Sequence, residues 1–473
     1  MGVFNIFDVI KQFFDTFGAP VFVPIIIFII ALFLKVPVKK AFMSALTAGV
    51  GLMGFTLVIN AYAPIVTPIV NNMVENTGVD LPVFDIGWQT TSIVAYSTEI
   101  GIIFVGVCIL LQTILFLTRY TNVFQPGDLW NNYSYMVWGS MIFLVTGNIW
   151  LGIACMIVQM LFTQLFAEMI QKRWSTYYKY PNCTLASLHT VSVAPYAIAM
   201  DWILNKFGLY KIKANPQVFK KKLGFIGEPM TLGLFLGLFI GIIGNLTQLN
   251  ELASWGQIAT CGIATAAVMA VFPKISAIFA GSFTAITESS KKSVKGTKGE
   301  WYLSVNDAAG YGESATLISG IIMMPIVLLV AFVLPGNQTL PMIDLVALPY
   351  LIQPIIAVSN GNIFKTIISG SIWFSIALLF TTWTAPVFTS VASEIGVEFG
   401  VGIMLVTSLV ILGQPIAALI FFAFVSQSLL WIGLTVSIYV VGYVLLRKKK
   451  HVLHEYLERK AVISDAHGDG RVA

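Results

Sequence analysis

The chain has 473 residues, of which 57% are hydrophobic and 10% are charged, and its formal net charge is +5. Soluble proteins carry roughly 25% charged residues, so this composition excludes a soluble globular protein and predicts an all-α polytopic membrane protein. The basic residues lie mainly between apolar runs, where they indicate the orientation of membrane helices, so we expect no nucleic-acid partner.

Cysteine and histidine usage gives no sign of a metal or cofactor site. The four cysteines lie in or beside apolar runs, without a Cys-x-x-Cys pattern; they are Cys108, Cys155, Cys183 and Cys261. Such residues are typical of small core positions in a reduced or membrane setting. We therefore expect no disulfide, no metal and no cofactor.

In chain order, residues 1–18 suit an interfacial helix, because phenylalanines recur in a weakly charged stretch. About eleven apolar runs of crossing length follow. They cover residues 19–34, 41–63, 93–118, 130–147, 150–171, 229–249, 257–280, 314–334, 342–359, 362–383 and 425–446. Basic residues after the first and the last run predict an external N-terminus and a cytoplasmic C-terminus.

Two further apolar stretches are unsuited to a simple crossing. Residues 185–204 have basic residues on both sides and contain Pro195 and Asp201, so we expect a re-entrant or interfacial segment there. Residues 401–422 contain Gly413-Gln414-Pro415, which predicts a discontinuous helix.

Short patterns recur in both halves of the chain in the same order. Gly147-Asn148 reappears as Gly361-Asn362 (361 − 147 = 214), and other echoes have similar offsets. Because the predicted topology runs in opposite directions in the two halves, we expect two inverted repeats, which are typical of secondary transporters. The predicted parts are an interfacial helix (1–18), a first repeat (19–205), a basic cytoplasmic linker (206–228), a second repeat (229–446) and a charged cytoplasmic tail (447–473).

Glu228 is the first candidate for chemistry. It directly precedes Pro229 at the predicted start of a glycine-rich helix, where a carboxylate faces the positive end of the helix dipole. Carboxylates are costly in membrane segments and are often functional there; the alternative is that Glu228 only caps its helix. Gly233, Gly237 and Gly241 recur every four residues and predict the close approach of another backbone.

Three further side chains lie at predicted breaks in apolar segments. The amides of Asn148 and Asn362 can hydrogen-bond the hydroxyl groups of a solute; a tight turn facing water is the alternative. His189 lies inside the predicted re-entrant segment and is the only histidine before the C-terminal tail. It is a candidate ligand or proton carrier, and the alternative is a structural histidine with satisfied hydrogen bonds.

Two polar segments precede helices at related positions of the two halves. In the first half, Gln89 and Thr90 follow Trp88, and amides beside an aromatic surface are typical of sugar and polyol sites. In the second half, Asp307 and Glu313 add two carboxylates. We take these four polar residues as candidate substrate ligands, with ordinary surface loops as the alternative.

Four motifs together resemble one known family. They are, in chain order, Asp85-Ile-Gly-Trp88, Gly227-Glu-Pro-Met-Thr-Leu-Gly233, Pro335-Gly-Asn-Gln-Thr-Leu-Pro341 with Asp344-Leu345, and Gly361-Asn-Ile-Phe-Lys-Thr-Ile-Ile-Ser-Gly370. From about residue 15 to residue 445, the chain resembles the galactitol-type IIC permeases of the bacterial phosphoenolpyruvate-dependent sugar phosphotransferase system, in the ascorbate/galactitol superfamily.

This resemblance implies a homodimer in the lipid bilayer, whose protomers combine a scaffold with a transport core that moves in an elevator-like way. It implies uptake of a polyol, first of all galactitol, with phosphorylation by the cysteinyl phosphate of a separate cytosolic IIB protein that a IIA protein charges. We then expect Glu228 to bind polyol hydroxyls and act as base, with His189 as its competitor. Residues 206–222 and 291–298 are the expected docking face for IIB.

Other functions stay open at this point. An ion-coupled symporter that releases its solute unmodified fits inverted repeats and intramembrane carboxylates equally well. A pore or receptor scaffold would use the glycine-rich helices only for packing. Within the family, ascorbate is an alternative to a polyol. The chemical form of the solute inside the cell distinguishes the first of these from the phosphotransferase function.

Overall fold

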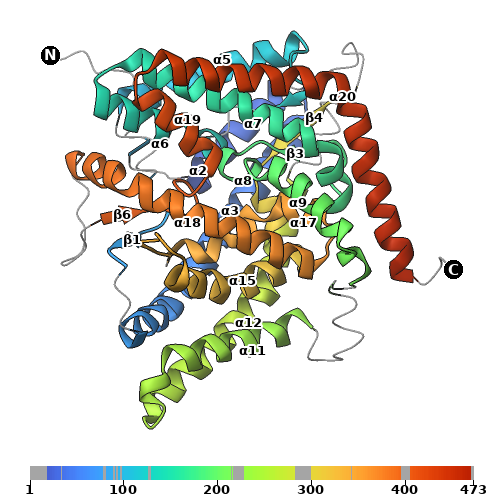
Figure 1. The fold of residues 1–473 in the computed structure, drawn as a ribbon. Helices are drawn as coiled ribbons and strands as arrows, with labels where there is room; N and C mark the ends of the chain where they lie inside the picture. Colours follow the sequence, from blue (N-terminus) through green and yellow to red (C-terminus); the bar gives the residue numbers. More distant parts are fainter. Residues whose placement is uncertain are drawn as a thin grey trace.

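The computed structural model describes residues 19–469 apart from gaps at 34, 78–80, 89–90, 92–93, 96–97, 126–128, 213, 215, 217–227, 283–299, 342 and 396–404. Most of the described residues are helical (Figure 1). The predicted interfacial helix at 1–18 and the basic segment at 291–298 lie outside the described residues.

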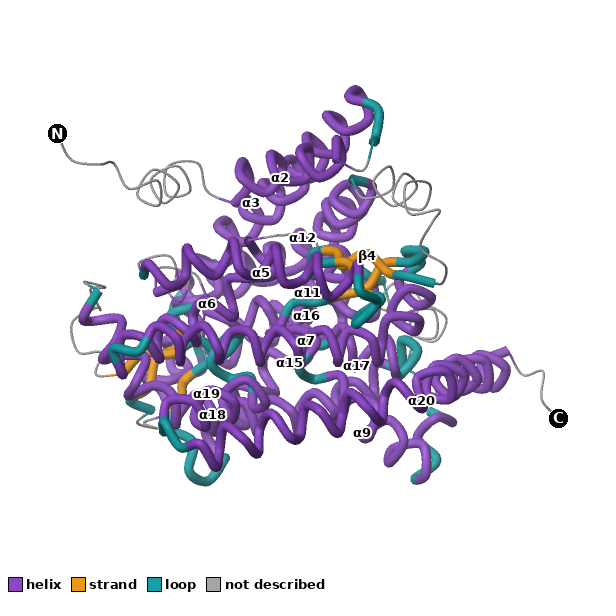
Figure 2. Tube along the Cα trace, turned by 90° about the horizontal axis from the view of Figure 1, so that it is seen from above, coloured by secondary structure: helices purple, strands orange, loops and turns teal. Residues whose placement is uncertain are grey.

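The described part of the first half contains the long helices α2 (Ala19–Phe33), α3 (Val38–Thr77), α5 (Glu99–Leu117), α6 (Leu129–Thr146) and α7 (Ile149–Tyr178). The second half contains α11 (Pro229–Gly244), α12 (Leu252–Gly281), α15 (Ser314–Val333), α18 (Ile363–Glu394), α19 (Pro415–Val425) and α20 (Leu429–Asp469). Seen from above, α2 and α3 lie at one edge of the molecule and α18 and α19 at the opposite edge (Figure 2).

Five described helical segments are long and apolar enough to cross a membrane: Ile149–Tyr178, Leu252–Val271, Ser314–Val333, Ile363–Glu394 and Leu429–Ala461. The predicted polytopic helical protein therefore agrees with the structure, whereas the number of eleven crossings stays a prediction. α20 continues through the predicted tail to Asp469, so no break in secondary structure separates 447–469 from the last apolar run.

The prediction of one continuous helix over 342–359 is wrong. This stretch is divided into a 3₁₀-helix (Ile343–Ala347), α16 (Leu348–Leu351) and α17 (Gln353–Val358). Pro349 and Pro354 each lie in the first turn of a new helix, because a proline disfavours the helical conformation of the residue before it. None of the three pieces is long enough to cross a bilayer.

Both stretches predicted to be unsuited to a simple crossing are broken in the structure. Residues 185–204 begin in a strand and continue as α8 (Leu188–Val191) and α9 (Ala194–Lys206). Residues 401–422 contain, in their described part, a short strand, a non-helical segment and the start of α19. These interruptions expose backbone groups, and such groups must find partners when they lie inside a membrane protein.

Within the described residues, six short strands provide those partners; the mostly helical fold agrees with the prediction, which did not include these strands. They are β1 (Val83–Asp85), β2 (Val123–Phe124), β3 (Cys183–Leu185), β4 (Tyr302–Val305), β5 (Thr339–Leu340) and β6 (Leu405–Thr407). Sheet A has the order β5-β1-β6 and sheet B the order β2-β4-β3, and all pairs are parallel. Each sheet places a strand of one half between two strands of the other half, so the two halves exchange backbone hydrogen bonds.

The glycine repeat of α11 packs as predicted. A Cβ atom added at Gly233 would lie 2.9 Å from the carbonyl oxygen of Thr265, and one at Gly237 would lie 2.5 Å from that of Cys261. A Cβ atom at Gly241 would lie 2.9 Å from Cα of Ile258. Glycine thus lets the backbones of α11 and α12 approach closely, and these two helices pack with α3, which also contacts α2.

Candidate functional site

The candidate site lies where two neighbouring strands of sheet B end. β3 and β4 run parallel, so the segments that follow them leave the same edge of the sheet. His189 lies in α8, just after β3, and Asp307 lies just after β4. The Nε2 atom of His189 is 2.9 Å from Oδ2 of Asp307, and the side chains are 2% and 0% exposed, respectively. The structure therefore joins two predicted site residues that are 118 positions apart.

Polar neighbours hold the carboxylate of Asp307 and the backbone around it in place. The hydroxyl group of Thr190 donates a hydrogen bond to the same Oδ2 atom, at 3.0 Å. The side-chain amide of Gln353, in α17, donates to the backbone oxygen of Asp307. Tyr180 donates to the carbonyl oxygen of Ala309, at 3.1 Å. Burial raises the pKa of Tyr180 to about 12, so its phenol remains a neutral hydrogen-bond donor at physiological pH.

Aromatic rings connect this pair with the loop that follows sheet A. The ring of Tyr133, in α6, is centred 5.9 Å from the imidazole of His189. The ring of Trp88 is centred 6.3 Å from that of Tyr133. Gln89 and Thr90, which directly follow Trp88 in the chain, lie outside the described residues. Tyr133 therefore connects Trp88, beside sheet A, with the His189–Asp307 pair beside sheet B.

The arrangement can move a proton. A carboxylate that accepts a hydrogen bond from one ring nitrogen of histidine orients the imidazole and stabilises its protonated form. The other nitrogen, Nδ1, is then the atom that accepts a proton. A polyol hydroxyl that becomes a nucleophile must lose its proton, so this pair fits a general base.

Glu228 and Glu313 both precede helices but have different local roles. Glu313 caps α15: its carboxylate accepts hydrogen bonds from the backbone nitrogens of Ala315 and Thr316 and from the hydroxyl group of Thr316, all within 3.0 Å. Glu228 is half-buried at the N-cap position of α11, yet its side chain makes no capping hydrogen bond with that helix. A substrate contact of either residue stays a prediction.

Asn148 and Asn362 occupy the same position in two helices. Each is the N-cap residue of a long helix, α7 or α18, and each follows a glycine with positive φ. Asn148 is exposed, and its oxygen accepts hydrogen bonds from Trp150 and Leu151. Asn362 is buried and also donates to the carbonyl oxygen of Ile212. The capping role is shown for both, and binding of a solute stays a prediction.

A second buried cluster lies beside sheet A and contains two carboxylates, those of Asp85 and Asp344. The sequence did not indicate that these residues lie together. Oδ1 of Asp344 accepts from the backbone nitrogen of Trp88 at 2.9 Å. Its Oδ2 accepts from the hydroxyl group of Ser408 at 2.6 Å and from the backbone nitrogen of Val410 at 2.9 Å. Asp85 accepts in turn from the backbone nitrogen of Asp344, at 2.9 Å. These carboxylates hold loops of both halves together.

Sequence reasoning missed Tyr133 and Gln353 as neighbours of the site. Gln353 is a polar residue within a predicted apolar run, directly before Pro354, and Tyr133 lies in the polar start of α6. A polar side chain in an apolar segment is a signal of a functional or packing role. That signal was present, but the sequence alone does not show which other residue such a side chain meets.

Comparisons with known proteins agree on the family to which the chain is similar. The family model described as the sugar-specific permease component of the PTS system matches residues 12–402. The PTS system galactitol-specific EIIC component of Escherichia coli (strain K12) is 28% identical over 439 residues, which cover 92% of this chain and 95% of that protein. The protein of the same name from Escherichia coli O157:H7 matches with the same identity and the same coverage.

Proposed function

Because the chain belongs to the family of PTS sugar-specific permease components, we propose that it takes up a polyol that is phosphorylated as it enters the cell. Proteins of this family are multi-pass proteins of the inner membrane that work with IIB and IIA proteins. Galactitol is the first candidate substrate, because two relatives that match nearly the whole chain carry that name. Ascorbate is the second candidate within the superfamily.

We place the substrate beside the His189–Asp307 pair. The observation that carries this assignment is the buried contact of 2.9 Å between these residues, in a region that Trp88 and Tyr133 supply with aromatic surface. Carboxylates, amides and a flanking ring are the groups that suit a polyol with several hydroxyl groups. Glu228 is proposed as a further ligand, and Gln89, Thr90, Asn148, Glu313 and Asn362 remain candidate ligands.

The proposed reaction is transfer of a phosphoryl group from a IIB protein. The bond between cysteine sulfur and phosphorus breaks, a bond between the polyol oxygen and phosphorus forms, and sulfur leaves as a thiolate. The hydroxyl proton passes to Nδ1 of His189 or to the carboxylate of Glu228. The contact with Asp307 favours His189 as this base, which reverses the order expected from the sequence. Positioning and charge stabilisation supply most of the rate in such transfers.

Alternating access by an elevator-like motion is the proposed transport mechanism. The packing of α2, α3, α11 and α12 on one another supports a scaffold made of these helices, with the rest as the transport core. The exchange of strands between the halves in sheets A and B supports the inverted repeat. The homodimer, the external N-terminus, the cytoplasmic C-terminus and the docking of IIB on the basic segments at 206–222 and 291–298 are parts of the same proposal.

The test is uptake of labelled galactitol by vesicles that contain this protein, with and without phosphorylated IIB at the face that carries the C-terminus. We expect galactitol phosphate to accumulate only with the phosphorylated donor. Uptake of ascorbate instead, again with phosphorylation, would change the substrate and keep the mechanism.

A second candidate function has one observation in its favour. A buried carboxylate–histidine pair such as His189–Asp307 can also carry the proton of a proton-coupled symporter. Accumulation of unmodified galactitol, driven by a proton or sodium gradient without IIB, would favour this function and contradict group translocation.

A further inference from the structure

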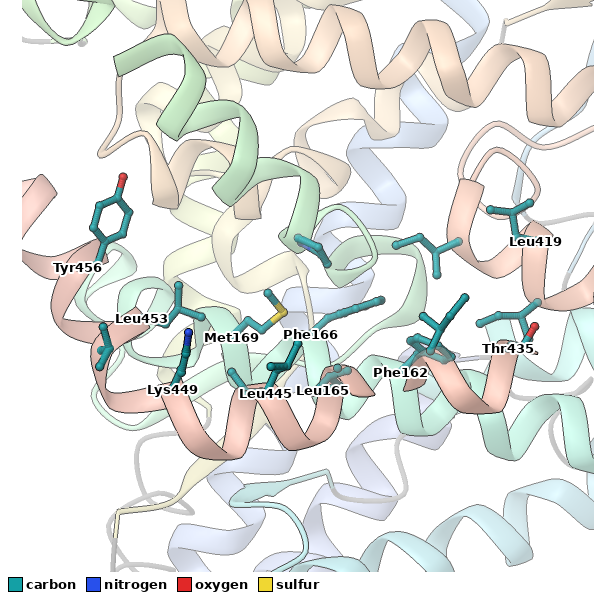
Figure 3. A pocket seen from close by; sticks show the side chains of 17 residues that line it. Phe162, Leu165, Phe166, Met169, Leu419, Thr435, Leu445, Lys449, Leu453 and Tyr456 are labelled. Atoms are coloured by element: carbon teal, nitrogen blue, oxygen red, sulfur yellow. The ribbon is translucent and has the colours of Figure 1, made fainter. Parts of the chain in front are cut away.

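A large apolar cavity opens between α7, α19 and α20, away from the groups assigned to transport. Its volume is about 840 Å³, within the range of roughly 300–1,000 Å³ that is typical of ligand sites. Figure 3 shows Phe166 and Met169 of α7, Leu419 of α19 and Lys449 of α20 around it. Its lining contains none of the residues of the His189–Asp307 site.

The helix that forms one wall of the cavity lies at the outside of the molecule. In the most apolar window of α20, 11% of the residues are buried, whereas the corresponding share in α7 is 56%. Leu429 and Leu430, at the start of α20, are 86% and 75% exposed. α20 lies along α7 over its first part and then bends away toward the C-terminus (Figure 1). The hydrocarbon chains of a bilayer can therefore reach the cavity from the side of α20.

Basic side chains lie along α20 beside the cavity. The apolar part of α20 ends at the run Arg447-Lys448-Lys449-Lys450. Glu168 of α7 is 2.6 Å from Nζ of Lys450 and 3.5 Å from Arg447, and so balances part of this charge. Lys448 and Lys449 are exposed, and neither has an ion-pair partner within the described part of the chain. Lys449 lines the cavity itself.

We propose that this cavity binds one anionic phospholipid. Its acyl chain lies between α7, α19 and α20, and its phosphate lies beside Lys449 and Lys448. The apolar lining matches the acyl chain, and the charge of Lys449 in the lining, with Lys448 next to it, matches the phosphate, since basic residues beside a membrane span attract anionic headgroups. The proposal concerns only this cavity and does not depend on the transported solute.

A second copy of the chain is a poorer occupant for the same surface. In a twofold dimer built across α20 within one membrane, the two copies of the basic run would lie at the same level. Like charges that face each other across an interface are repulsive, and such juxtaposition costs affinity. A lipid phosphate removes this repulsion, because it supplies the negative charge that the cavity does not contain.

The test measures lipids retained by the full-length protein in detergent, by native mass spectrometry, with phosphatidylglycerol and phosphatidylcholine of identical acyl chains. We expect preferential retention of phosphatidylglycerol, and inorganic phosphate should not displace it. Lys449→Gln should reduce this retention about fivefold, the effect of one basic residue near an anionic headgroup. Arg459→Gln, at an exposed residue of the same helix that does not line the cavity, is the matched control and should retain the lipid.

A second variant fills the apolar part of the cavity. Leu419 is 57% exposed, so Leu419→Trp should fold normally and reduce retention of both lipids. Leu329→Trp, at an exposed position on α15, is its control. Equal retention of the two lipids by the native protein would overturn the proposal. So would unchanged retention in Leu419→Trp, or a shift of that variant from dimer to monomer without loss of lipid, which would assign the surface to a second copy.

Discussion

The two sheets are built on one plan, but the carboxylates beside them have different partners. At sheet A, Asp344 accepts hydrogen bonds from two backbone nitrogens and one hydroxyl group. At sheet B, Oδ2 of Asp307 accepts a hydrogen bond from the hydroxyl group of Thr190 and lies 2.9 Å from Nε2 of His189. A backbone nitrogen can only donate, whereas an imidazole and a hydroxyl group can exchange donor and acceptor roles.

This difference is the reason for treating Asp344 as part of a structural junction and Asp307 as part of the proposed site. Fixed donors around Asp344 suit a permanent charge that holds loops of the two halves together. Adaptable partners around Asp307 suit a carboxylate whose surroundings change protonation during a reaction. Burial alone does not distinguish the two aspartates, because both are 0% exposed. The kind of hydrogen-bond donor distinguishes the two aspartates, and the following variants test this distinction.

The largest effect is expected for Asp344→Asn. In either orientation, the new amide nitrogen would face the backbone N–H group of Trp88 or of Val410, and neither N–H group can become an acceptor. An unsatisfied buried donor costs roughly 1–3 kcal/mol, and loss of the charge weakens the other bonds. We expect a loss of roughly 3 kcal/mol or more, a large part of a typical total of about 5–15 kcal/mol. Thermal unfolding of the purified protein measures it.

Asp307→Asn is the matched variant for this stability test. Here the new amide can donate to the imidazole of His189 or to the hydroxyl oxygen of Thr190 after these groups adjust. We expect an unfolding temperature close to that of the native protein. Equal destabilisation by the two substitutions would show that both carboxylates are structural and would remove the distinction between the sheets.

The second effect is loss of transport activity, and we expect it for substitutions of the residues beside sheet B. Asp307→Asn and His189→Gln should each lower IIB-dependent formation of galactitol phosphate by about 10²–10⁴-fold, the usual contribution of general acid–base catalysis. Both variants should remain folded. His451→Gln, at an exposed histidine of α20, is the control and should keep full activity. A full rate in His189→Gln would exclude the pair from the reaction.

The sequence predicted local features well because their causes are local. The start of α11 at Pro229, the helix breaks at Gly147-Asn148 and Gly361-Asn362, and the glycine packing of α11 follow from a few neighbouring residues. The strands escaped prediction because segments of two to four residues contain no measurable periodicity. They form only through partners in the other half of the chain.

The candidate site was predicted in its members but not in its geometry. His189 and Asp307 were both named, yet a contact over 118 positions depends on the parallel pairing of β3 with β4. The broken stretch at 343–358 was missed for a related reason: most of its residues are apolar, as in a crossing helix. Its prolines divide it, and this places Gln353 against Asp307.

A third, smaller effect is expected for the two glutamates that precede helices. Glu313→Gln should lower stability by about 1 kcal/mol, because its carboxylate caps α15. Glu228→Gln should remove no capping bond of α11, because the Glu228 side chain makes none. It should instead raise the galactitol concentration for half-maximal uptake about tenfold, the loss of one hydrogen bond to a charged group. Unchanged uptake and phosphorylation would leave Glu228 with only its position at the helix dipole.

The smallest effect is expected for the two glycines before α7 and α18. Both have a positive φ angle, but they differ in the atoms that surround them. Gly147 has φ of +68°, and no atom lies within 4 Å of a Cβ added there, so Gly147→Ala should cost only the strain of the left-handed backbone, roughly 1–2 kcal/mol. Gly361 has φ of +74°, but an added Cβ would lie 2.9 Å from the hydroxyl oxygen of Tyr177. Gly361→Ala should therefore lower the unfolding temperature further, by the displacement of Tyr177, about 1 kcal/mol or more. Equal shifts would mean that Tyr177 moves freely, and that the contact between α7 and the turn before α18 contributes little to holding the two halves together.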